Sequence, residues 1–161
     1  MRVRVVVADQ SEARFYDTAS LNATLQPAGG LTDPNAHLHE RDLVSDRPGR
    51  VFDHAPPASG RRGAVGHHGT GGERSARKHE AGIFAHRIAD ELASAAREGG
   101  IERIVLMAAP GFLGLLRKAL PRSVQEAVVA EVHKDLVHQP DEVVQAHVPR
   151  EAFGEVPREP R

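Results

Sequence analysis

The sequence contains no cysteine and no tryptophan, and its aromatic residues are limited to five phenylalanines and one tyrosine among 161 residues. The absence of cysteine excludes disulfides, thiolate nucleophiles and metal sites with cysteine ligands. With so few aromatic side chains, a core must be built from Val, Leu, Ile and Ala. A chain of this length forms one domain by default.

Long hydrophobic runs are also lacking. The apolar stretch at the start of the chain, residues 3–8, is interrupted by Arg4 and is shorter than the core of a signal peptide. It is far too short for a membrane-spanning helix. We therefore expect a cytoplasmic protein that makes no membrane contact.

The formal net charge of -1 conceals a local excess of positive charge. Residues 58–79 contain five Arg or Lys, three His and a single acid, Glu73. A basic patch on a protein that is neutral as a whole indicates a localised anionic partner.

The N-terminal part of the sequence predicts three antiparallel strands. Residues 3–8 are β-branched and nearly continuously apolar, which is typical of a strand buried on both faces. Residues 9–11 have turn composition, and residues 12–18 alternate in the manner of a returning strand. A third alternating segment, residues 20–25, stops before Pro27.

The remainder predicts helices alternating with strands. Residues 28–72 show no periodicity and are rich in Gly, Pro, His and charge, so we expect a long loop whose second half is mobile. A helix is expected over residues 73–98, ended by Gly99 and Gly100. A buried strand at residues 104–107, a helix, a strand at residues 128–132 and a last helix follow.

This order predicts an α/β fold with a five-stranded mixed sheet: three antiparallel strands, then helix, strand, helix, strand and helix. The strands at residues 3–8 and 104–107 should be neighbouring, parallel and central. The same order occurs in ribonuclease-H-like folds. We expect a single domain over residues 1–148 that includes the loop 28–72, and a frayed tail over residues 149–161.

Metal chemistry finds little support in the sequence. A two-metal nuclease needs carboxylates at strand ends, but only Asp9 is so placed, and we interpret it as a turn residue. His67, His68 and His79 lack the fixed helical spacing of a zinc site, so we interpret them as solvated histidines. No nucleophile-elbow or phosphate-loop motif is present. We expect no metal and no cofactor.

Three cations share one face of the expected helix start. Arg74, Arg77 and Lys78 are spaced i, i+3 and i+4 and fall on the stripe that Ile88 and Leu92 use for the core. Because three buried cations are implausible, the helix should extend past the sheet there. Such a helix start, with free N–H groups beside glycines, would bind phosphate; a merely solvated helix end is the alternative.

A second charged cluster surrounds the Pro48-Gly49 turn. We interpret it as a loop of ion pairs that stabilises the structure or presents an arginine to an anion. Its members are Arg41, Asp42, Asp46, Arg47, Arg50 and Asp53.

Several separated motifs occur in an order that resembles the bacterial host attachment protein family. They are "VVVADQSEARFYD", "RDLVSDRPGRVFD", "ARKHE", "LMAAPGFLGLLRKAL" and "VVAEVHKDLVH". The resemblance covers almost the whole chain, from residue 5 to about residue 148. His133 and Gly111 depart from the residues more usual in that family. The resemblance implies a protein required for attachment to host cells.

That family is similar in turn to the central domain of archaeal and eukaryotic class I peptide release factors, which implies the ribonuclease-H-like topology. Release factors carry a Gly-Gly-Gln tripeptide before a long basic helix and act on peptidyl-tRNA in the ribosome. Here Gly71 and Gly72 match, but Glu73 replaces the glutamine, and a carboxylate cannot donate hydrogen bonds as an amide does. Hydrolysis is therefore not implied by the resemblance.

Two functional hypotheses follow. The first is a release-factor-like module that contacts the ribosome, tRNA or other RNA. The alternative is a non-catalytic, adhesion-linked or regulatory protein-interaction module. The residues assigned to the RNA or phosphate contact are Gly71, Gly72, Glu73, Arg74, Arg77, Lys78 and His79.

Overall fold

The computed structural model of the protein describes residues 1–35 and 62–154, with the backbone alone described for residues 62–71 and 73. The elements in chain order are β1 (Val3–Ala8), β2 (Glu12–Thr18), β3 (Gln26–Thr32), α2 (Arg62–Glu98), β4 (Arg103–Met107), α3 (Pro110–Ala119), α4 (Arg122–Ala127), β5 (Val128–Val132), α5 (Asp141–Ala146) and the 3-10 helix η1 (Arg150–Phe153).

In this part of the chain the strands form one mixed sheet of five strands in the order β3-β2-β1-β4-β5. The pairs β1–β2 and β2–β3 are antiparallel, whereas β1–β4 and β4–β5 are parallel. The predicted α/β fold is confirmed, and so is the prediction that the first and fourth strands are parallel neighbours away from the sheet edges. Their nearly continuous apolar runs reflect burial on both faces.

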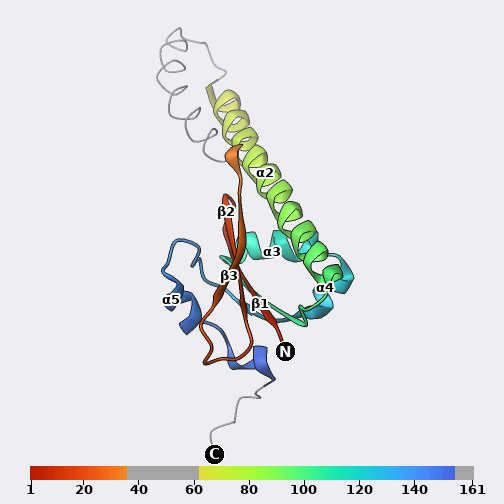
Figure 1. The fold of residues 1–161 in the computed structure, drawn as a ribbon. Coiled ribbons are helices and arrows are strands. Elements are labelled where there is room, and N and C mark those ends of the chain that lie inside the picture. Colours follow the sequence, from red (N-terminus) through yellow and green to blue (C-terminus); the bar gives the residue numbers. More distant parts are fainter. Residues whose placement is uncertain (36–61, 155–161) are drawn as a thin grey trace, which may run out of the picture.

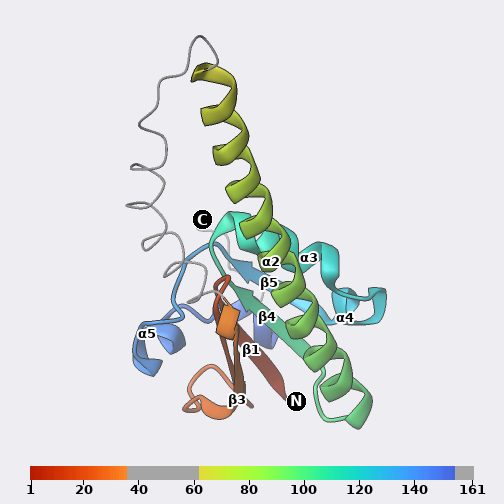
Figure 2. The same ribbon diagram turned by 90° about the horizontal axis from the view of Figure 1, so that it is seen from above.

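Each face of the sheet carries its own apolar layer. Because side chains alternate along a strand, Val6 and Ala8 of β1 face α2, α3 and α4, whereas Val5 and Val7 face the opposite layer, which includes residues of α5 and η1. Figures 1 and 2 show these helices on the two sides of the sheet. The protein is thus a three-layer structure with the sheet in the middle.

Helix α2 is held to the sheet by its C-terminal half. Its buried residues recur at helical spacing and include Phe84, Ile88 and Leu92. The Phe84 ring lies 6.3 Å from that of Phe112 in α3, and Arg87 Nη1 donates to the carbonyl oxygen of Thr32 in β3 at 3.1 Å. The N-terminal half of the helix projects beyond the sheet (Figure 1).

The third strand was predicted at the wrong place. It covers Gln26–Thr32 and not residues 20–25, so it includes Pro27 and two glycines. Proline is tolerated because β3 is an edge strand, where a missing N–H costs no ladder bond. The register shifts between Arg14 and Tyr16, Gly29 has φ +113°, and a Cβ on Gly30 would lie 2.9 Å from the Ala13 carbonyl oxygen. Backbone geometry, not side-chain alternation, defines this strand.

The expected loop 28–72 is wrong at both ends. Its first residues belong to β3, and α2 begins at Arg62, eleven residues before the predicted start. Each glycine in a helix costs about 1 kcal/mol relative to alanine, but extending a nucleated helix is far easier than starting one. The buried half of α2 supplies that nucleus. Across the described residues, no helix combines the length and apolar character needed to cross a membrane.

The expected fraying after residue 148 is wrong for the first part of the tail. Residues Arg150–Phe153 form η1, and Ala152 is fully buried in the layer opposite α2. Arg103 Nη1 of β4 donates to the Ala152 carbonyl oxygen at 3.2 Å. This contact to a neighbouring strand anchors the segment; residues 155–161 lie outside the described part.

An ion pair between α3 and β5 gives the first prediction. Arg117 Nε donates to Glu131 Oε1 at 3.0 Å, and Arg117 Nη2 contacts Glu131 Oε2. These hydrogen bonds from Arg117 hold the pKa of the Glu131 carboxyl below its usual value of 4.5. A lowered pKa in the folded state means that the stabilisation is present above pH 4.5 and is lost as the pH falls through the folded-state value. We therefore expect Arg117→Gln to lower the melting temperature at pH 7 and to have progressively less effect below pH 4.5.

The matched control for this measurement is Arg122→Gln, because Arg122 forms a highly exposed pair with Glu126 within one helix. Exposed ion pairs of that kind contribute little to stability, so the melting temperature of Arg122→Gln should equal that of the parent protein at every pH. Thermal unfolding followed by circular dichroism from pH 7 to pH 3 makes the comparison. If the melting temperature of Arg117→Gln stays below that of the parent protein by the same amount from pH 7 to pH 3, the prediction is contradicted.

Candidate functional site

The candidate site begins on the projecting half of α2. Arg74, Arg77, Lys78 and His79 are all exposed, and the first buried residue after them in the helix is Ala81. The stripe that packs on the sheet further along the helix has nothing described to pack against here, as Figure 2 shows from above. The exposed residues Arg74, Arg77, Lys78 and His79 are called the basic surface below.

The cations of the basic surface are close together and exposed. Residues three and four apart on a helix have Cβ atoms about 5–6 Å apart. Within the part of the chain that the structure describes, neither Arg74, Arg77 nor Lys78 forms an ion pair. Three neighbouring cations that have no ion-pair partner among the described residues repel one another, and a bound polyanion would relieve that repulsion.

The prediction that free N–H groups of a helix start near residue 73 bind phosphate is wrong. The helix does not start there, because α2 begins at Arg62. Arg74 lies twelve residues into the helix, so the backbone N–H groups around it serve the helix itself. Any anion must therefore be held at the basic surface by side chains.

Other residues assigned from the sequence are only partly visible. Gly71, Gly72 and Glu73 lie within the helical backbone of α2, and Gly72 is exposed. The side chains of His67, His68 and Glu73 lie outside the described part. The whole predicted ion-pair loop, which comprises Arg41, Asp42, Asp46, Arg47, Arg50 and Asp53, also lies outside the described residues.

A groove adjoins the basic surface where α2 passes α3. Its volume is about 470 Å³. Its lining residues are Ser75, Lys78, His79, Gly82, Ile83, His86 and Leu115. Ile83 remains 45% exposed although it lies beside the buried Phe84. The sequence interpretation missed Ile83, His86 and Leu115, because helical spacing alone does not reveal which face of α2 borders α3.

A second cleft, of about 530 Å³, lies where β1 and β4 end. Asp9 Oδ1 accepts hydrogen bonds from the backbone N–H groups of Ser11 and Glu12 at 2.8 and 2.7 Å, which confirms the interpretation of Asp9 as a turn residue. His138 lies between two carboxylates, 3.4 Å from Asp9 Oδ2 and 3.5 Å from Glu12 Oε2. The cleft is therefore acidic and does not suit an anion.

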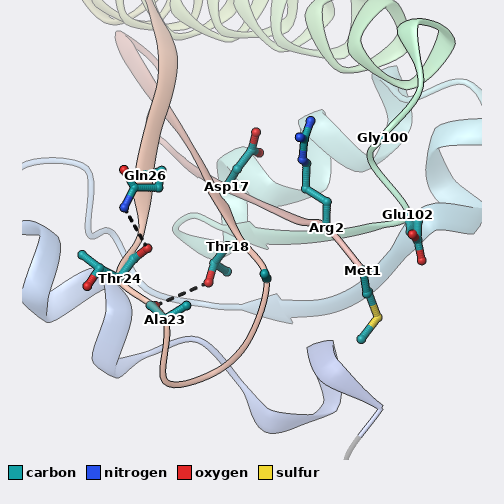
Figure 3. A pocket seen from close by; sticks show the side chains of 10 residues that line it. Met1, Arg2, Asp17, Thr18, Ala23, Thr24, Gln26, Gly100 and Glu102 are labelled. Carbon is teal, nitrogen blue, oxygen red and sulfur yellow. Dashed lines mark hydrogen bonds between the residues drawn. The ribbon is translucent and has the colours of Figure 1, made fainter.

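A third cavity, of about 820 Å³, opens near the N-terminus (Figure 3). Arg2 and Gln26 line it together with the acidic residues Asp17 and Glu102. Figure 3 shows that these side chains come from several separate segments, with Thr18 and Gln26 bonded to nearby backbone carbonyl oxygens. Its mixed charges define no ligand class, which leaves the basic surface and its groove as the candidate site.

The fold and the site together define an α/β protein with a central mixed sheet and a projecting basic helix. The sequence profile of the family described as "Protein required for attachment to host cells" matches residues 4–148, and the chain belongs to this family. No curated protein matches the sequence.

Similarity to solved structures is distant. A structure described as "Archaeal protein" has 10% sequence identity and a TM-score of 0.44. The similarity covers 95% of this chain and 37% of that one, so the chain spans little more than a third of the length of that protein.

Proposed function

We propose that the protein is a cytoplasmic, release-factor-like member of the host attachment family that contacts RNA or the ribosome through the basic surface. The observation that carries the proposal is the exposure of Arg74, Arg77 and Lys78 on the projecting half of α2, without ion-pair partners among the described residues. Side chains of this kind attract phosphates, and such contacts make binding dependent on salt.

The resemblance of Gly71, Gly72 and Glu73 to the release-factor tripeptide gives the proposal its choice of partner. RNA fits the surface because its phosphates are spaced along a chain and can meet several cations at once. No catalytic step is proposed, because the carboxylate at position 73 lacks the donor of an amide.

The test is binding to purified bacterial ribosomes and to tRNA between about 50 and about 200 mM salt. Changing Arg74, Arg77 and Lys78 together to alanine should weaken binding and flatten the slope of log affinity against log salt by about two units, since each phosphate contact contributes roughly 0.7 to 0.9. Folding should be kept, because alanine is a good helix former. Co-sedimentation and fluorescence anisotropy measure the two quantities.

The charge-matched control changes Arg97, Arg122 and Arg150 to alanine. These residues are also exposed but lie away from the basic surface, at the end of α2, in α4 and in η1. The control should retain the salt slope of the parent protein. Equal slopes for all three proteins would refute the basic surface as an RNA contact.

A further expected result concerns Glu73. Replacing it by glutamine removes a negative charge one residue from Arg74 and restores the release-factor tripeptide. RNA binding should therefore tighten, most clearly at low salt, where charge repulsion is least screened. Glu91→Gln, an exposed position of α2 far from the basic surface, serves as the control and should leave RNA binding unchanged. An affinity for Glu73→Gln at or below that of the parent protein would contradict the expectation.

A further inference from the structure

The groove between α2 and α3 has an open floor that folding does not require. A Cβ placed on Gly82 would meet no atom within 4 Å. Glycine inside a helix lowers stability relative to alanine, so neither packing nor helix formation explains a glycine at this position. Its effect is to deepen the groove between the side chains on either side.

The lining residues on α2 form one continuous stripe. Ser75, His79, Gly82 and His86 are separated by four, three and four residues, so they lie one above another on the helix surface. This stripe is distinct from the core stripe of Phe84, Ile88 and Leu92. It is ~16 Å long at 1.5 Å per residue, which matches a helical segment of about eleven residues.

The chemistry of the groove is apolar in the centre and basic at the edges. Ile83 and Leu115 supply aliphatic surface, while Lys78, His79 and His86 supply nitrogen atoms. No acidic residue lies among its lining residues, all of which belong to the described part of the chain. Aromatic side chains, on which nucleic acid bases stack, are equally missing from that lining.

We infer that this groove binds a short acidic amphipathic helix of a partner protein. An apolar side chain of the partner sits over Gly82 between Ile83 and Leu115, and its Asp or Glu residues face Lys78, His79 and His86. Helix-in-groove recognition uses anchors at this spacing. The Lys78 ammonium is complementary to a carboxylate, and the rings of His79 and His86 can donate hydrogen bonds to carboxylate oxygens. The groove shares Lys78 and His79 with the basic surface, but its apolar centre at Gly82, Ile83 and Leu115 is not part of the proposed RNA contact.

The probe is a library of random twelve-residue peptides displayed on phage and selected on the parent protein alone; each selected peptide is then tested for binding to Gly82→Leu. Leucine fills the floor of the groove, and because leucine favours helices over glycine, this variant should unfold at no lower temperature than the parent. Selected peptides should combine Asp or Glu with apolar residues at i, i+3 or i+4 spacing. Selection without such a pattern, or peptides that bind Gly82→Leu as well as the parent, would overturn the inference.

The strongest selected peptide is then measured by fluorescence anisotropy on further variants. Ile83→Asp should weaken binding at least ten-fold, whereas Gly111→Leu, an exposed glycine of α3 outside the groove with free space around it, should not change it. Changing Arg74 and Arg77 to alanine should affect RNA binding and leave peptide binding intact. If Gly82→Leu instead abolishes RNA binding, the groove belongs to the RNA contact and the protein-partner inference is wrong.

Discussion

Replacing Phe84 by alanine is expected to lower the free energy of unfolding by about 3–5 kcal/mol, as for other large aromatic side chains removed from a core. Phe84 is 1% exposed and joins three elements: it lies on α2, packs in the layer over the sheet and contacts Phe112 of α3. The Arg87 guanidinium lies 5.6 Å from the ring centroid and loses its aromatic partner as well. Loss of the ring therefore leaves a cavity at the point where α2 is attached.

Urea denaturation and thermal unfolding measure this effect. For a chain of this length, 1 kcal/mol corresponds to roughly 2–4 °C in melting temperature, so a shift on the order of 10 °C is expected. The adjacent Ile83→Ala is the control, because Ile83 is 45% exposed and surface changes are usually within about 0.5 kcal/mol. If Phe84→Ala and Ile83→Ala lower the free energy of unfolding by similar amounts, Phe84 is not an anchor of α2.

Replacing Asp17 by alanine is expected to lower the free energy of unfolding by about 3 kcal/mol, as when one partner of a buried ion pair is removed. Asp17 of β2 lies opposite Arg4 of β1 and accepts two hydrogen bonds from it, at 2.7 Å from Nε and 3.1 Å from Nη2. The Arg4 side chain is only 10% exposed and lies beside the Phe15 ring. Removing the carboxylate leaves a nearly buried cation without its partner, which is costlier than losing the whole pair.

The double variant Arg4→Leu, Asp17→Ala separates these two costs. With both charges removed, an apolar side chain occupies the place of Arg4 beside Phe15, and stability should return to within about 1–2 kcal/mol of the parent protein. Chemical denaturation of the parent, both single variants and the double variant completes the cycle. A double variant less stable than Asp17→Ala alone would contradict this account.

The sequence predicts the centre of the fold better than its edges, for a physical reason. Strands β1 and β4 are buried on both faces, so apart from Arg4 and Arg103 their residues are apolar, and the apolar runs are visible in the sequence. Edge strand β3 is mostly exposed, and its residues follow backbone geometry at Gly29 and Gly30, which hydrophobic patterning does not record. The same holds for the start of α2, where glycines predicted a loop but helix extension prevailed.

The candidate site, too, could be predicted from the sequence only in part. Helical spacing was sufficient to group Arg74, Arg77 and Lys78 on one face and to require that the helix extend beyond the sheet. The groove could not be predicted from the sequence, because it forms only where α3 packs against α2. Leu115, one of its lining residues, lies 32 residues after Ile83 in the chain. Likewise, the contact of His138 with Asp9 depends on the topology of the sheet, because no local pattern links residues so far apart.

Pro27 has a consequence for the behaviour of the protein at high concentration. An unpaired strand at the edge of a sheet is a template on which another chain can add a strand, and natural proteins block such edges to avoid aggregation. On β3, Pro27 offers no N–H to an incoming strand, and the positive φ of Gly29 interrupts the extended backbone two residues later. The residues that hid this strand from the sequence pattern also protect the β3 edge against self-association.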